Sequence, residues 1–140
     1  MTDPATELRE AASLLREAAS HATEGPWRPH DTWLDHGGHT ATVLTDRPDI
    51  NQTELVAWLP TMSSTPWDET RNTWRNAGWM ALMHPGVGLA VADWLKSTAL
   101  TVDAVAKHRP DAVIEDENAH WLVPALAVAR QILGTEAKTR

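Results

Sequence analysis

The sequence predicts an α+β fold: an N-terminal helix, a small antiparallel sheet of two or three strands, and three C-terminal helices packed on that sheet. Three observations indicate this class. Residues 4–24 have the alanine-rich spacing of a helix, residues 27–59 change to β-branched residues in short alternation, and residues 66–133 return to helical spacing. Because three short strands are not stable alone in water, we expect helices to cover the apolar side of the sheet.

The length predicts a single domain spanning residues 1–140, since 140 residues can bury a core without disulfides or a structural metal. The chain contains no cysteine. No apolar run approaches the roughly 18 residues that cross a membrane, and the acidic start lacks a basic region followed by an apolar stretch. We therefore expect a cytoplasmic protein with no membrane partner.

Charge and aromatic content restrict the partners. A net charge of -7 disfavours the clustered Lys and Arg side chains that bind phosphates, so we expect no nucleic-acid partner. The chain has eight Trp but no Phe or Tyr. These tryptophans either fill ordinary core positions or form an exposed patch that binds a protein partner. Both interpretations stay open, for different rings.

The helix predicted over residues 4–24 begins with Asp3 as its cap and ends before Gly25 and Pro26. Its pentapeptide LREAA occurs twice, so Leu8 and Leu15 recur with a seven-residue spacing. Two heptads are fewer than the three or four that usually define a coiled coil. The helix therefore either docks on its own domain or associates with a second copy as a homodimer.

The β region spans residues 27–59. Its clearest strands are Thr40–Thr45 and Thr53–Leu59, and Pro29 interrupts a third around Trp27–Leu34. The Gly37–Gly38 pair predicts a tight hairpin turn, because such turns need positive φ values. Residues 46–52 are expected to form a loop.

A connector over residues 60–65 leads to a helix predicted over 66–83, with Thr65 as its cap and Pro66 at its first position. Trp67 and Trp74 share one stripe of this helix, while Trp79, Met80 and Met83 lie opposite. Its second half is apolar nearly all round. A helix of this kind is normally buried, so we expect it to be the central element of the core.

Two more helices are predicted over residues 85–107 and 118–133. In the first, one arc contains most of the apolar residues: Val87, Val91, Trp94, Leu95, Thr98, Val102 and Val105. The second should stop at Gly134, and Pro124 is compatible with it only in the first turn or at a kink. Residues 85–88, PGVG, either present N–H groups to an anion or pack at a tight corner; without a neighbouring Lys or Arg, packing is favoured.

Several short motifs together resemble the Ead/Ea22-like small proteins of phages and actinobacterial genomes. They are the triplet Gly25-Pro26-Trp27, the start Asn76-Ala77 with Ala81 and Pro85 behind it, the end Asp93-Trp94-Leu95, and the closing run from Leu126 to Arg130 with Gly134. Trp79 and Met80 stand where such proteins often have Phe or Tyr followed by Ile. The resemblance implies an accessory protein of phage or prophage origin, with no established activity and no catalytic residues.

Catalytic motifs are mostly missing. The sequence contains no phosphate loop, no dinucleotide-binding glycine pattern, no nucleophile elbow and no His-Glu-x-x-His pair. We expect no cofactor. Asp35, His36 and His39 surround the predicted hairpin turn and are candidate ligands for zinc or nickel. A solvated polar turn is favoured, because the glycines give such ligands no supporting contacts.

We therefore expect a noncatalytic protein that acts by protein–protein interaction. The candidate surfaces are a helix face with Trp67, Arg71, Trp74 and Arg75, where arginines lie beside tryptophans, and the face of the first helix with Leu8 and Leu15. The alternative is a small metal-dependent hydrolase that assembles histidines and carboxylates from different elements. Its candidate residues are His36, His39, His84 and Asp93.

Overall fold

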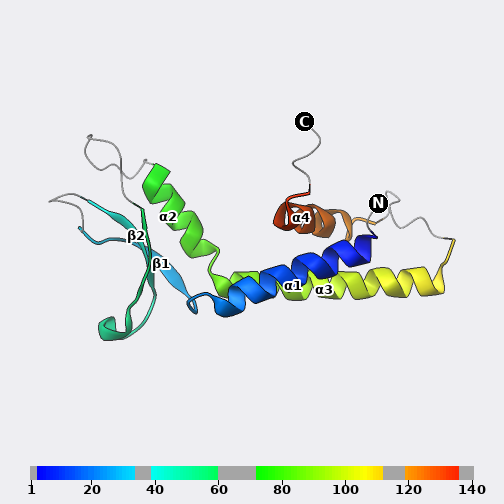
Figure 1. Cartoon of the computed structure of the whole chain (residues 1–140), viewed down its shortest axis with the longest axis horizontal. Helices are drawn as coiled ribbons and strands as arrows, with labels where there is room; N and C mark the ends of the chain where they lie inside the picture. Colours follow the sequence, from blue (N-terminus) through cyan, green and yellow to red (C-terminus); the bar gives the residue numbers. More distant parts are fainter. Residues whose placement is uncertain (1–2, 34–38, 60–71, 112–118, 136–140) are drawn as a thin grey trace. The chain divides into compact units, whose positions relative to one another are not determined.

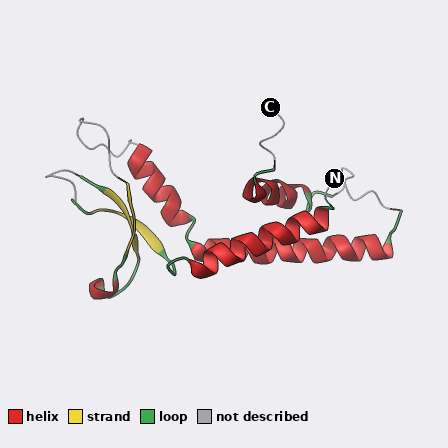
Figure 2. Ribbon diagram, viewed as in Figure 1, coloured by secondary structure: helices red, strands yellow, loops and turns green. Residues whose placement is uncertain are grey.

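The computed structural model describes residues 3–33, 39–59, 72–111 and 119–135. They form an N-terminal helix, a three-stranded antiparallel sheet and three further helices, which confirms the α+β class (Figure 1; Figure 2). In chain order the elements are α1 (Pro4–His21), β1 (Trp27–Asp31), β2 (Ala41–Thr45), the short 3-10 helix η1 (Ile50–Gln52), β3 (Leu55–Leu59), α2 (Asn72–Leu82), α3 (Pro85–His108) and α4 (Val123–Leu133).

The chain divides into two compact units. Unit 1 comprises Met1–Ala18 and Gly88–Arg140, and unit 2 comprises Ala19–Val87. Each unit has its own hydrophobic core and is described by itself. The single domain expected from the length stays a prediction. Among the described residues, no helix combines the length and the apolar character needed to cross a membrane.

Unit 1 is a helical unit in which α1, α3 and α4 share one core. Small side chains dominate this core, so the helices approach closely: Ala5, Leu8, Ala11 and Ala12 of α1 meet Ala92, Leu95, Ala99 and Val102 of α3 and Ala125, Leu126 and Ala129 of α4, with Ala119 and Leu122 before α4. The heptad-spaced face of α1 is therefore used within the chain, as the intramolecular interpretation predicts.

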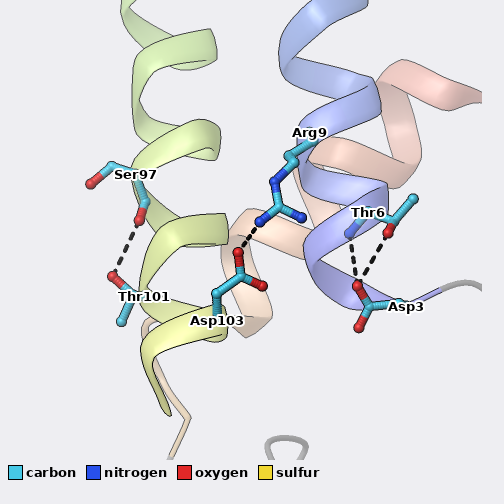
Figure 3. A network of polar contacts seen from close by, with 6 residues as sticks. All are labelled: Asp3, Thr6, Arg9, Ser97, Thr101 and Asp103. Carbon is cyan, nitrogen blue, oxygen red and sulfur yellow. Dashed lines mark hydrogen bonds and ion pairs between the residues drawn. The ribbon is translucent and has the colours of Figure 1, made fainter. Parts of the chain in front are cut away.

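Ion pairs flank this core. Arg9 pairs with Asp103 (Figure 3), and Arg16 pairs with Asp93. Residue numbers therefore rise along α1 as they fall along α3, so the two helices run antiparallel. These pairs are solvent-exposed and contribute little individually. A third ion pair joins α1 to α4. Arg130 Nε of α4 donates to Glu7 Oε2 of α1 at 2.9 Å, and the Glu7 side chain is only 13% exposed.

The helix ends follow local capping rules. Asp3 caps α1, because its carboxylate accepts the backbone N–H of Thr6 at 3.1 Å (Figure 3). Pro124 lies in the first turn of α4, where a missing N–H has no cost. Gly134 ends α4 with φ 67°, a left-handed conformation that glycine adopts without strain.

Unit 2 is built on the sheet, whose strand order is β1-β2-β3 with both pairs antiparallel. In the first pair Trp27 lies opposite Thr45 and Asp31 opposite Ala41; in the second, Ala41 lies opposite Leu59. Helix α2 covers one face and packs mainly on β1 and β2. The expected helical cover of the sheet is thus provided by α2, while α3 and α4 complete the core of unit 1.

A tight corner joins the end of α2 to the start of the sheet. His84 lies against Gly25 and Gly86, so closely that a Cβ added at Gly25 would come 2.8 Å from His84 Cγ. The His84 Nδ1 atom accepts the N–H of Gly86 at 3.1 Å. The PGVG segment therefore uses this N–H group for its own corner, as the packing interpretation predicts.

Candidate functional site

Helix α2 has an inner face that belongs to the core of unit 2. Ala77 and Ala81 are buried against Ala41 and Val43 of β2. Trp74 and Met80 pack around them, together with Trp27, Val56, Ala57 and Leu59 of the strands. Since Ala77 and Ala81 are one helical turn apart, small side chains line the contact and allow α2 to lie close to the sheet.

The opposite side of α2 is exposed and apolar. Trp79 is 65% exposed, Leu82 71% and Met83 47%. Arg75 is exposed one turn before Trp79, and its spacing from Trp79, Leu82 and Met83 places all four on one side of the helix. We call these four residues the α2 outer face. The prediction that the second half of this helix is buried is therefore wrong for Trp79, Leu82 and Met83, because the helix turns its other side, with Ala77, Met80 and Ala81, toward the sheet.

The α2 outer face is positively charged as well as apolar. Helix α2 contains one ionisable residue, Arg75, and no carboxylate, in a chain whose net charge is -7. Burying apolar surface in an interface contributes a favourable free energy of about 25 cal/mol per Å². A surface with this composition fits a partner segment that combines apolar side chains with a carboxylate.

The residues predicted for this helix separate in the structure. Trp67 and Arg71 lie outside the described residues, so that half of the prediction stays untested. Trp74 faces the core of unit 2, whereas Arg75 is exposed on the other side. Trp79, Leu82 and Met83 were not predicted as binding residues. An all-apolar pattern is typical both of a buried helix and of an interface, and the sequence does not distinguish these two cases.

The second predicted surface, on the first helix, forms part of a core. Leu8 is fully buried within unit 1, and Leu15 packs against the same cluster. A side chain without exposed area offers no contact to a partner, so Leu8 is corrected from a binding residue to a core residue. Among the large apolar residues of α1, Leu14 is the exposed one, at 49%.

An Asp–His pair closes the described end of the β1–β2 hairpin. Asp31 Oδ2 lies 2.5 Å from His39 Nδ1, and Asp31 Oδ1 accepts the backbone N–H of Thr40 at 2.8 Å. Trp33 has a positive φ of 55° and its ring lies 4.0 Å from that of His39, centroid to centroid. The carboxylate therefore fixes the imidazole and the hairpin backbone together.

This environment changes the acidity of Asp31. Burial raises the pKa of its carboxyl, but the hydrogen bonds from His39, Thr40 and Trp33 and the charge of His39 outweigh burial, so the pKa lies below its ordinary value. A lowered pKa means that the ionised carboxylate stabilises the fold. That contribution is complete above the ordinary carboxyl pKa of about 4 and is lost as the pH falls through the lowered value.

Asp31→Asn is therefore expected to destabilise the protein by about 1–2 kcal/mol at pH 5.5, because an amide replaces a charged acceptor. The difference from the wild type should shrink below about pH 4, where the wild-type carboxylate is itself protonated. Thermal unfolding between pH 5.5 and 2.5 measures this. Asp46→Asn, which removes an exposed acid near Arg28, is the control and should have a small effect. A difference that stays constant with pH would contradict the role of the carboxylate.

The metal candidates are only partly described. Asp35 and His36 lie outside the described residues, and His39 contacts Asp31. Within the described ranges, no group of three or more His, Asp or Glu side chains is arranged to hold a metal ion. Of the residues named for a hydrolase, His84 lies at the glycine corner of unit 2 and Asp93 pairs with Arg16 in unit 1.

A groove lies between α1 and α3 in unit 1. It has a volume of about 290 Å³ and is lined by Arg9, Ala12, Ser13, Arg16, Lys96 and Leu100. Its two guanidinium groups are already paired with Asp103 and Asp93. The groove is open to solvent, and its lining includes no histidine or carboxylate.

Comparison with known proteins gives no relative: no family model matches the chain, and neither a curated protein nor a solved structure is detectably similar to it. The resemblance to Ead/Ea22-like proteins therefore stays a prediction. The function has to be argued from the surfaces described above.

Proposed function

We propose that this chain is a noncatalytic accessory protein, of phage or prophage type and cytoplasmic, that binds another protein through the α2 outer face. One observation carries the proposal: Trp79, Leu82 and Met83 lie together on one side of a helix and are 47–71% exposed. Contiguous exposed apolar side chains are typical of interaction sites, and Trp and Arg are enriched among the residues that dominate binding energy.

The residues of the α2 outer face also indicate the chemistry of the partner segment. Arg75 supplies a positive charge at one end of the apolar stripe, and α2 supplies no negative charge. A complementary segment has apolar side chains that cover Trp79 and Leu82, and an acidic residue within reach of Arg75. The phage or prophage setting and the cytoplasmic location come from the resemblance and the composition given in the sequence analysis.

Replacing Trp79 and Leu82 together by Ala is expected to reduce recovery of the partner at least tenfold, because truncating central apolar residues typically costs about 2 kcal/mol or more in binding. The measurement is quantitative mass spectrometry of proteins recovered with the tagged full chain from its native host cells. Arg75→Glu should also reduce recovery, and by more at low salt, since an acidic partner would then meet a like charge.

Ile50→Ala is the matched control. Ile50 is 81% exposed and apolar but stands alone on η1 of the same unit. Proteins that depend on the α2 outer face are retained by Ile50→Ala and lost with the double variant. If the double variant has an unchanged circular dichroism spectrum and recovers the same proteins in the same amounts, the proposal is wrong.

A further inference from the structure

The two outer strands of the sheet differ in their protection against pairing with another strand. In β1, residues 27–31 read WRPHD and include a proline and two charged residues. In β3, residues 55–59 read LVAWL, with no charge, proline or glycine. Proteins normally protect exposed edges with charges or proline, because an open edge presents unpaired N–H and C=O groups. Of these two devices β1 has both and β3 has neither, although β3 carries a bulge between Leu55 and Ala57.

The hydrogen-bond alternation shows which groups point outward. Thr32 N–H donates to Thr40 C=O at 3.2 Å, so even-numbered residues of β2 direct their backbone groups to β1. Odd-numbered ones therefore face β3, as the bond from Thr45 N–H to Glu54 C=O at 3.0 Å confirms. Pro29 lies opposite Val43 and thus occupies an outward-facing position of β1, where its missing N–H blocks further pairing.

The same alternation leaves β3 open. Ala57 and Leu59 lie opposite Val43 and Ala41 and face β2, so Trp58 between them directs its N–H and C=O to the outer edge. Trp58 is 48% exposed, and α2 contacts β3 least of the three strands. Among the described residues, β3 ends the sheet and no strand pairs with its outer side.

Side chains extend this apolar edge onto the face of the sheet away from α2. Trp58 lies opposite Thr42, and Leu55 lies opposite Leu44 beyond a bulge. Leu55 is 53% exposed. The outward-facing side of an antiparallel sheet is normally polar. Here the edge combines open backbone groups with an exposed Trp and an exposed Leu, which is the combination that strand addition buries.

We propose that β3 pairs antiparallel with β3 of a second copy, joining two three-stranded sheets into one of six strands. A second copy fits because an antiparallel pair of identical strands is self-complementary: each satisfies the outward groups of the other about a two-fold axis. The strand is uncharged, so pairing brings no like charges together at the seam, although each chain carries -7. The Trp58 side chains of the two copies then lie side by side on the face of the sheet away from α2.

The expected dimer is weak. The bulge limits regular pairing to the residues around Trp58, and this short segment covers far less than the roughly 800 Å² per partner of a stable interface. We expect a dissociation constant in the micromolar range. Sedimentation velocity of the full chain from about 10 to 500 µM is therefore the measurement, and it should show a mass that rises with concentration from 15.4 kDa toward twice that value.

Trp58→Pro copies the protection that Pro29 gives to β1. It removes the outward N–H without removing a bond to β2, and it should weaken the dimer at least tenfold. Trp58→Thr keeps the N–H and the β propensity and should weaken the dimer less. If Trp58→Pro fails to fold by circular dichroism, Leu55→Lys combined with Trp58→Lys replaces it, since charges on the edge oppose pairing.

Three outcomes would overturn the proposal. A monomer at every concentration excludes the pairing. A dimer that survives Trp58→Pro or the double lysine variant but is lost with Leu14→Glu assigns self-association to α1. A dimer lost only with Trp79→Ala assigns it to the α2 outer face. The recovery experiment tests the α2 outer face, whereas sedimentation tests pairing of β3. A failure of the proposed function is therefore distinguishable from a failure of the β3 pairing.

Discussion

Leu8→Ala is expected to lower the free energy of unfolding by about 3 kcal/mol, and Leu95→Ala by a similar amount. Both side chains are fully buried in the core of unit 1. Truncating a buried leucine loses its transfer free energy and leaves a cavity, and the neighbouring alanines are too small to fill it. Urea unfolding followed by far-ultraviolet circular dichroism measures the helical transition.

Leu14→Ala and Leu100→Ala are the controls on the same two helices. Leu14 is 49% exposed and Leu100 60%, so each should cost less than about 1 kcal/mol. If Leu8→Ala were no more costly than Leu14→Ala, Leu8 would have to face solvent, and the first helix face would return as a candidate binding surface.

Gly25→Ala is expected to cost about 2–3 kcal/mol, because the added methyl group overlaps the ring of His84. The cost should fall to below about 1 kcal/mol in a His84→Ala background, where the ring is absent. The coupling between the two substitutions, measured from urea unfolding of the four proteins in the cycle, reports this contact directly.

Gly78→Ala is the matched glycine control. A Cβ at Gly78 meets no atom within 4 Å, and the residue lies inside α2. Alanine is the better helix former by about 1 kcal/mol, so this variant should be slightly more stable than the wild type.

The outcome that would contradict the contact between Gly25 and His84 is an equal cost of Gly25→Ala in the presence and in the absence of the His84 ring.

Much of the fold could be predicted from local signals. Asp3, Gly134 and the position of Pro124 mark helix ends through groups that act within one turn, and the structure has all three in these roles. The alternation of residues 41–45 and 55–59 likewise predicts strands. Helix α1 nevertheless ends at His21 rather than residue 24, since helix ends depend on contacts as well as on stop signals.

The arrangement of the helices was harder to predict. The arc proposed for α3 includes Trp94, which is 40% exposed, whereas Ala92 and Ala99 on the other side of the helix are buried. A hydrophobicity pattern gives weight to large side chains, but α1 packs closely on α3 and this contact favours small ones. The same reason explains α2, where Ala77 and Ala81 rather than Trp79 face the sheet.

The candidate site was therefore predicted in part. Arg75 was named from the sequence and is exposed on α2, and its role in binding stays a prediction. Trp79, Leu82 and Met83 were assigned to the core, since sequence alone does not show which of two apolar sides a helix turns inward. The pairing of His39 with Asp31 depends on strand register, which brings residues eight positions apart into contact.

The central claim is that the α2 outer face contacts another protein. Its most direct measurement is site-specific photo-crosslinking in host cells, with a photoreactive amino acid at position 82 and, as the control, at position 50. Leu82 and Ile50 are comparably exposed in the same unit, at 71% and 81%. The claim predicts a discrete adduct with another polypeptide from position 82, reduced by Arg75→Glu, and none from position 50. The same adducts from both positions, or none from position 82, would contradict it.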